Sequence, residues 1–137
     1  MDTFSLSILA PERRLLQNER ATSLVVTTVD GEIEILPGHA NLVGILAPGR
    51  FVYQAEGQKA VTGVISSGFV NVEEESVKVV AETIELAQEI DVNRAKAAQK
   101  KAEEMLTAAG MDEQTFRKYQ LKVQRAIIRQ QIGGVSI

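Results

Sequence analysis

Hydrophobic and polar residues alternate along the first part of the chain. Phe4, Leu6 and Ile8 are separated by serines, and a later alternation places Val70 and Val72 on one side of their segment. A strand with one buried and one exposed face needs this period of two. Pairs of turn-forming residues separate such segments, at Asp30-Gly31, Pro37-Gly38, Pro48-Gly49 and Glu56-Gly57. The pattern predicts about nine to ten short strands over residues 1–87, packed as a β-sandwich.

After Ile90 the hydrophobic period becomes helical. Asp91 is placed to cap the first helix, and Gly110 to end it in a left-handed conformation. A second helix is predicted from about Asp112 to Gln131, stopped by Gly133-Gly134. The expected apolar stripes are Val92, Ala95, Ala98, Ala102, Met105 and Ala109 on the first helix and Phe116, Tyr119, Val123 and Ile127 on the second.

So short a connection predicts that the two helices form an antiparallel hairpin over residues 88–137. The fold class is therefore α+β, a β-sandwich followed by a two-helix hairpin. Alanine contributes little apolar area, so we expect the hairpin to hold together weakly and to be a part that moves.

Charge divides the chain at the same place as periodicity. The net charge of the 137 residues is −3, but residues 1–90 carry −7 and residues 91–137 carry +4. The cations of the second part are interleaved with alanine and aliphatic residues, and Phe116 and Tyr119 are its only aromatic residues. This argues for a solvated helix face and against a nucleic-acid partner.

The composition excludes several kinds of chemistry. Cysteine is absent and His39 is the only histidine, which leaves no basis for disulfides, cysteine-ligated metals, a catalytic triad or a histidine metal cluster. No Gly-x-x-x-x-Gly-Lys-Ser/Thr loop is present, so nucleotide hydrolysis is not expected. Without a signal-like start or an apolar run of about 20 residues, we expect a bacterial cytoplasmic setting, although a plastid-encoded chain would share these features.

Basic residues of the two predicted helices can meet in the folded hairpin. Arg94 and Lys101 are seven residues apart on one helix face, and Arg125 and Arg129 are four apart on the other helix. Clustered cations repel one another, so either solvent screens them or an anion such as a triphosphate lies between them. From the spacing of these residues alone, screening by solvent is the favoured interpretation.

Three sequence strings resemble the epsilon subunits of bacterial-type F-type ATP synthases. Residues 31–42, Gly-Glu-Ile-Glu-Ile-Leu-Pro-Gly-His-Ala-Asn-Leu, are similar to the family's Gly-Glu-x-Gly-Ile-x-Pro-Gly-His-x-Pro-Leu, with Glu34 and Asn41 as departures. Residues 67–72, Ser-Gly-Phe-Val-Asn-Val, resemble its Gly-Gly-Phe-x-Glu-Val strand. Residues 90–95, Ile-Asp-Val-Asn-Arg-Ala, match the Ile/Leu-Asp-x-x-Arg-Ala motif that binds ATP in several bacterial members.

The resemblance implies a non-catalytic rotor subunit that couples proton flow to ATP synthesis and regulates ATP hydrolysis. It would lie on the cytoplasmic face of the bacterial plasma membrane, attached only through the complex. The sandwich, including Glu32 and His39, would meet the gamma subunit and the ring of c subunits. The hairpin would exchange between a compact state and an extended state that reaches the alpha and beta subunits, where Arg117, Lys118 and Lys122 complement acidic loops.

The resemblance also implies a regulatory ATP site, with no cofactor required. Ile90 and Ala95 would contact the adenine, and Glu85 and Asp91 would shape the pocket. The phosphates would face Arg94, Arg125 and Arg129, with Lys101 at a position where ATP-binding members carry arginine. The alternative is a free-standing small-molecule sensor or adaptor whose hairpin is a partner-binding arm.

Overall fold

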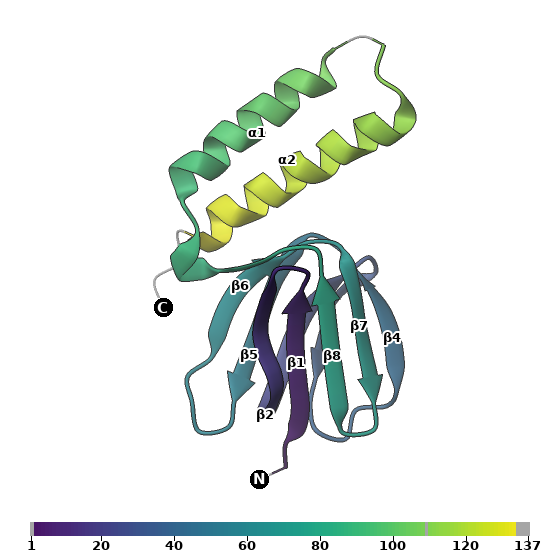
Figure 1. The fold of residues 1–137 in the computed structure, drawn as a ribbon, viewed down its shortest axis with the longest axis vertical. Coiled ribbons are helices and arrows are strands. Elements are labelled where there is room, and N and C mark those ends of the chain that lie inside the picture. Colours follow the sequence, from purple (N-terminus) through teal and green to yellow (C-terminus); the bar gives the residue numbers. More distant parts are fainter. Residues whose placement is uncertain (1, 109, 134–137) are drawn as a thin grey trace. The chain divides into compact units, whose positions relative to one another are not determined.

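The fold is described here from a computed structural model, which describes residues 2–108 and 110–133. The chain divides into two compact units, residues 1–86 and 87–137 (Figure 1). The first unit contains the strands and the second contains the helices. The sequence placed this boundary between residues 87 and 88.

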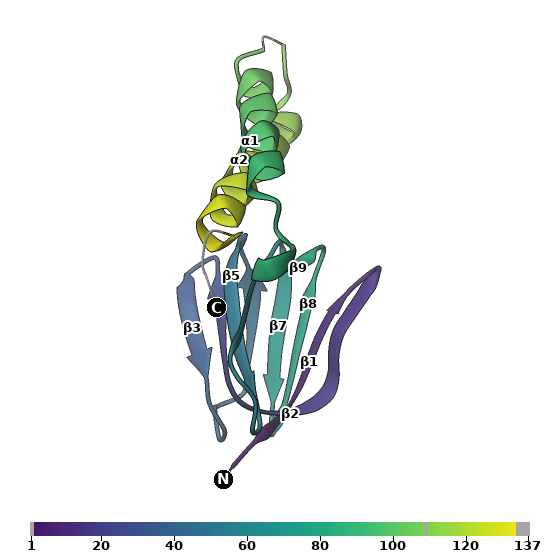
Figure 2. The same ribbon diagram turned by 90° about the vertical axis from the view of Figure 1, so that its left-hand side faces the viewer.

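The first unit contains nine strands in its described residues. They are β1 Phe4–Ala10, β2 Arg13–Thr28, β3 Gly31–Ile35, β4 Leu42–Leu46, β5 Gly49–Ala55, β6 Val61–Ile65, β7 Gly68–Glu73, β8 Ser76–Ala81 and β9 Ile84–Leu86. β2 is long enough to serve both layers of the sandwich: its first half pairs with β1, and its second half lies between β3 and β5. Figure 2 shows β3 and β5 in one layer and β7, β8 and β1 in the other.

The core of the sandwich follows the alternation in the sequence. Phe4, Leu6 and Ile8 are buried together with alternate residues of the facing strands. Phe51 and Tyr53 lie on the inner side of β5, with their rings parallel and the ring centroids 6.3 Å apart. Burial raises the pKa of the Tyr53 phenol. The predicted β-sandwich is confirmed, because strands of period two bury one face each.

The second unit consists of a short 3-10 turn, η1 Ala87–Glu89, and two helices, α1 Val92–Leu106 and α2 Glu113–Gly133. The Asp91 carboxylate accepts a hydrogen bond from the backbone N–H of Arg94 at 3.0 Å, which confirms the predicted N-cap. The predicted C-terminal cap was wrong. α1 ends at Leu106, four residues before Gly110, because Thr107 caps it and the Thr107 hydroxyl donates to the Glu104 carbonyl at 2.8 Å. Gly110 has φ +84°, and it lies in the connection between the helices. Gly134, predicted to help end α2, lies outside the described residues.

The seam between α1 and α2 is narrower than the stripes predicted. Ala95, Ala102 and Ala126 are its buried residues. Ala98 and Met105 are exposed, and Phe116 and Ile127 remain 40% and 38% exposed. The prediction that the whole stripes are buried was wrong. Packing of alanine against alanine brings the helices together along one narrow line, so the longer side chains of the stripes lie beside this line and stay at least partly exposed. Ala109, also predicted in the stripe, lies outside the described residues.

One polar pair crosses the seam between the helices. The Gln130 side-chain amide donates to the Gln99 side-chain oxygen at 2.6 Å, although 31 residues separate them in sequence. Gln99 in turn donates to Glu103 at 2.7 Å. A partly buried hydrogen bond is satisfied only in one alignment, so this pair fixes the register of the two helices. Among residues 2–108 and 110–133, neither helix combines the length and the hydrophobicity that a membrane-spanning helix requires.

The start of α2 should respond to pH through Asp112. Its carboxylate accepts a hydrogen bond from the backbone N–H of Thr115 at 2.7 Å, which lowers the pKa of Asp112. A lowered folded pKa means that the cap stabilises fully above the ordinary carboxyl pKa, and that this stabilisation is lost as pH falls through the lowered value.

We therefore predict that Asp112→Ala lowers the melting temperature of the helices at neutral pH. The difference from wild type should vanish in acid, as followed by far-UV circular dichroism. Asp112→Asn is the control, since its amide oxygen still accepts the bond but does not titrate here. If the melting temperature of Asp112→Ala stays below that of wild type by the same amount in strong acid, the capping explanation is wrong.

Candidate functional site

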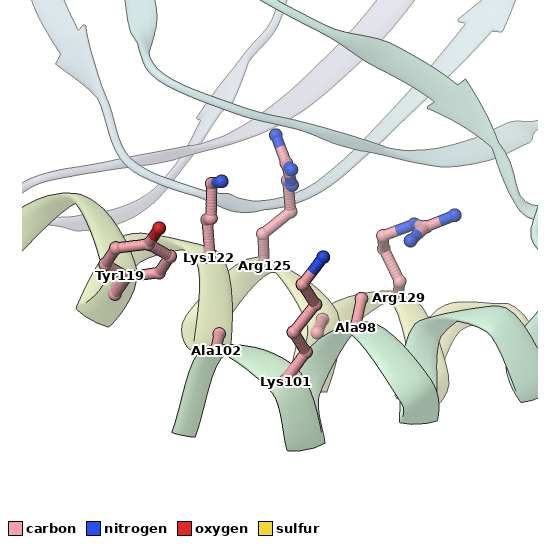
Figure 3. A pocket seen from close by; sticks show the side chains of 8 residues that line it. Ala98, Lys101, Ala102, Tyr119, Lys122, Arg125 and Arg129 are labelled. Atoms are coloured by element: carbon pink, nitrogen blue, oxygen red, sulfur yellow. The ribbon is translucent and has the colours of Figure 1, made fainter. Parts of the chain in front are cut away.

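A groove of about 240 Å³ runs along one face of the helical pair. It is lined from both helices by Ala98, Lys101, Ala102, Tyr119, Lys122, Arg125, Ala126 and Arg129. Figure 3 shows Lys101 of α1 and three basic side chains of α2 extending to the same side of the pair: Lys122, Arg125 and Arg129. The groove is thus formed entirely within the helical unit.

Small residues make this groove possible. Ala98 and Ala102 are one turn apart on α1, and Ala126 of α2 is buried beside them. Their short side chains leave space that leucine or methionine would fill. Because the helices approach closely along alanine, the cations on their flanks are brought to the same groove.

The lining of the groove is strongly electropositive. It contains two lysines and two arginines, and no carboxylate is found among its eight lining residues, all of which belong to the described part of the chain. Lys122 and Arg125 are half-buried, so solvent screens them less than fully exposed cations. The Lys122 ammonium lies over the Tyr119 ring, 5.0 Å from its centroid, in a cation–π contact. Such a surface suits an anion that carries several charges.

The groove brings together part of the predicted ATP site. Lys101, Arg125 and Arg129 line it, as the spacing along the two helices suggested. Tyr119 and Lys122 also line it, but sequence reasoning placed Lys122 only among partner-binding residues and assigned Tyr119 to an apolar stripe. Tyr119, Lys122 and Arg125 follow one another at intervals of three residues, and this spacing was the signal that could have found them.

Other residues predicted for the ATP site lie outside the groove lining. Asp91 is the N-cap of α1, and Arg94 is exposed one turn before Ala98. Ala95 is fully buried, so in this structure it offers no surface to an adenine ring. Ile90 is nearly buried, with Gly133 so close that an added Cβ would lie 2.7 Å from the Ile90 side chain.

Glu85 belongs to β9 of the sandwich, where it is paired with Val64 of β6. The roles of all these residues toward ATP stay predictions.

The sandwich presents an exposed apolar face on strands β4 and β7. Ile45 and Phe69 are directly paired across these strands, and Val43 lies two residues before Ile45 on the same side. The exposed fractions of Val43 and Ile45 are 74% and 63%, and Phe69 is also exposed. Val80 of β8, half-buried, is the cross-strand neighbour of Phe69. Exposed apolar residues gathered in this way are typical of surfaces that bind other proteins.

Glu32, predicted to contact a partner, forms an ion pair within the sandwich. Its carboxylate accepts from Arg50 in a two-pronged ion pair, with Arg50 Nη2 at 3.1 Å from Glu32 Oε1. The hydrogen bond from Arg50 lowers the pKa of Glu32. A partner would therefore meet an exposed ion pair here instead of a single carboxylate.

His39 lies in the loop between β3 and β4. Its backbone N–H donates to the Leu36 carbonyl at 3.1 Å, and its Nδ1 lies 2.7 Å from the Ala40 carbonyl oxygen. Leu36 is exposed beside it. The turn predicted at Pro37-Gly38 is present, with Gly38 at φ +84°.

The two remaining predicted partner residues, Arg117 and Lys118, are exposed on α2 outside the groove lining. Within residues 2–108 and 110–133, no group of three or more His, Asp or Glu residues is arranged to hold a metal ion.

Comparison with known proteins matches both units of the chain to one family. The sequence profile of the "ATP synthase, Delta/Epsilon chain, beta-sandwich domain" covers residues 3–87, and that of the "long alpha-helix domain" covers residues 88–133. The ATP synthase epsilon chain of Trichlorobacter lovleyi is 34% identical over 133 residues, or 97% of this chain and 95% of that one. The epsilon chain of Solibacter usitatus is 40% identical over 113 residues, or 81% and 83%.

Solved structures share the fold. A chain of the Euglena gracilis mitochondrial ATP synthase, in an assembly of OSCP, F1 and c-ring, has a TM-score of 0.81 at 24% identity, covering 93% of this chain and 79% of that chain. A chain from the central stalk and c-ring of the Tetrahymena thermophila mitochondrial enzyme has a TM-score of 0.64 at 10% identity, covering 94% and 95%.

Proposed function

Because this chain belongs to the delta/epsilon chain family of ATP synthase, a non-catalytic component of the central stalk, we propose that its two units divide docking and regulation between them. The match of one family over both units carries this proposal. It also disfavours the alternative of a free-standing sensor with a helical arm. As a peripheral component of the enzyme, the chain would lie on the cytoplasmic face of a bacterial plasma membrane.

The sandwich is the docking unit in this proposal. Its apolar face of Val43, Ile45 and Phe69 would be covered by the gamma subunit, because exposed apolar area is stabilised by burial at an interface. The His39 loop and the ion pair of Glu32 would meet the gamma subunit and the c-ring. A preset turn at Pro37-Gly38 suits such a contact, since less backbone freedom is lost on binding.

The helical unit is the regulatory part. Its alanine seam buries little area, and Phe116 and Ile127 keep exposed apolar surface that another partner can cover. The basic residues Arg117, Lys118 and Lys122 would complement acidic loops of beta subunits. In an extended state the helices would reach the alpha and beta subunits and oppose rotation in the direction of hydrolysis.

ATP would be the signal that sets the balance between the two states. A ligand that binds only the paired helices shifts the population toward the uninhibited state by its differential affinity. Two to four charge-assisted hydrogen bonds of about 1.5–3 kcal/mol each, reduced by solvent and by ordering, correspond to a dissociation constant in the micromolar to millimolar range. That range suits a sensor of cellular ATP.

The docking surface can be tested with Ile45→Asp. We predict that this change weakens binding of the gamma subunit at least about tenfold, because an unpaired carboxylate would be buried in the interface. The measurement is a pull-down titration with purified gamma subunit. Gln58→Asp, which adds the same charge in the exposed turn after β5, should bind like wild type. Equal binding by all three proteins would exclude this face from the interface.

The regulatory role can be tested by removing residues 91–137. We predict that ATP hydrolysis by the assembled enzyme rises at least about twofold, because the extended inhibited state is no longer available. Complexes reconstituted with the full chain serve as the reference, and equal gamma content in both shows that the sandwich still docks. Unchanged hydrolysis with normal assembly would rule out inhibition by this chain.

The ATP proposal can be tested by calorimetric titration of the full chain. Heat of binding is expected with wild type and should be lost with Arg94→Ala, whereas Lys96→Ala, also exposed on α1, should retain it. No heat at millimolar ATP would remove the nucleotide from the mechanism.

A further inference from the structure

Gly133, the last residue of α2, lies against the residues at the start of α1. A Cβ added at Gly133 would be 2.7 Å from Ile90 Cγ2, 3.1 Å from Ile90 Cβ and 3.1 Å from Val92 Cγ2. Carbon atoms in contact prefer a separation of about 3.5–4.0 Å, so an added methyl group would overlap both side chains. All three residues belong to the helical unit. The end of α2 therefore meets the start of α1 at a distance that only glycine allows.

Glycine is needed at this position for space and not for backbone conformation. The φ of Gly133 lies outside the left-handed region, in contrast to Gly110 with φ +84°. Alanine could therefore adopt the backbone of Gly133, and alanine is the more favourable of the two residues in a helix. The contact with α1 is what disfavours alanine here.

The side chains that contact Gly133 have little freedom to move aside. Ile90 and Val92 both branch at Cβ, which restricts rotation about χ1. Ile90 is only 9% exposed, so neighbouring atoms already surround its side chain. A methyl group at position 133 would therefore push the end of α2 away from α1.

The same face of α2 makes two further contacts along the seam. Gln130, one turn before Gly133, donates a hydrogen bond to Gln99 of α1 at 2.6 Å, and Ala126, one turn earlier, is buried. A hydrogen bond weakens steeply when its length or angle departs from the preferred geometry. Displacement of α2 at position 133 would therefore weaken the bond that aligns the helices.

We propose that the contact of Gly133 with Ile90 and Val92 closes the helical unit, and that the volume of the residue at position 133 sets the fraction of molecules whose helices are paired. Because the alanine seam buries little area, one added contact or clash at its end shifts this balance strongly. The inference rests on the proposed function, in which the paired helices are the uninhibited state.

The test is thermal melting of full-length variants, followed by far-UV circular dichroism. Gly133→Ala should lower the melting temperature of the helices by about 5 °C or more, because the steric overlap outweighs the gain in helix propensity. Gln131→Ala is the matched control. It introduces the same residue at an exposed position in the last turn of α2, and it should melt at or above the wild-type temperature.

A compensating change in α1 tests whether the effect arises from this contact. Ile90→Ala removes Cγ2, the atom nearest to the added methyl group. Relative to Ile90→Ala alone, the double variant with Gly133→Ala should show no lower melting temperature. Equal lowering with and without Ile90→Ala would overturn the closing contact, as would melting of Gly133→Ala at or above the wild-type temperature.

Hydrolysis by the assembled enzyme separates this inference from the proposed function. At equal gamma content, Gly133→Ala should lower ATP hydrolysis at least about twofold compared with wild type, because more of the helices are available for the inhibited state. If the melting results are as expected and hydrolysis is unchanged, the closing contact is supported and the regulatory role of the helices is overturned. If hydrolysis falls but Gly133→Ala melts like wild type, the closing contact is overturned.

Discussion

The close approach of α1 and α2 along alanine is the constraint on which the rest of the helical unit depends. Ala95, Ala102 and Ala126 are its buried residues, and each contributes only one methyl group, worth about 0.8 kcal/mol. The hydrogen bond from Gln130 to Gln99 fixes the alignment of the two helices but adds little to their stability. The pair therefore forms with a defined alignment but with a small free energy. The same short side chains leave the groove open and bring cations of both helices to its edges.

The sandwich has the opposite character. Its inner residues are fully buried on both layers, and β2 joins the layers by pairing with β1 at one end and with β3 and β5 at the other. Such a unit keeps its shape while it is held by a partner. The apolar residues on the outside of β4 and β7 are positioned by this rigid register, with Ile45 opposite Phe69. An extensive core thus holds the sandwich together, whereas few fully buried residues hold the two helices together.

The sequence predicted best those features of the fold that the local backbone geometry determines by itself. In strands, side chains alternate between two faces, so the buried set Phe4, Leu6 and Ile8 could be predicted directly. The cap at Asp91 was predictable for the same local reason. The stop at Gly110 was wrong because Thr107 satisfied the last carbonyls earlier. The stripe containing Phe116 and Ile127 failed, and Tyr119 was not assigned to the groove, because both depend on how two helices align across the seam. That alignment is a long-range property, and no local pattern contains it.

The groove and the seam are energetically linked, because a ligand in the groove needs residues of both helices. An anion bound between Lys101 and Arg125 would offset the repulsion of the cations and would bind only while the helices are paired. At a hundredfold excess over its dissociation constant, such a ligand stabilises the paired state by about 2.7 kcal/mol. Three buried alanine methyl groups contribute a free energy of the same order, about 2.4 kcal/mol. A leucine seam would bury more apolar area and make the ligand's contribution minor, so a seam of alanine would let a small bound anion control the state of the helices.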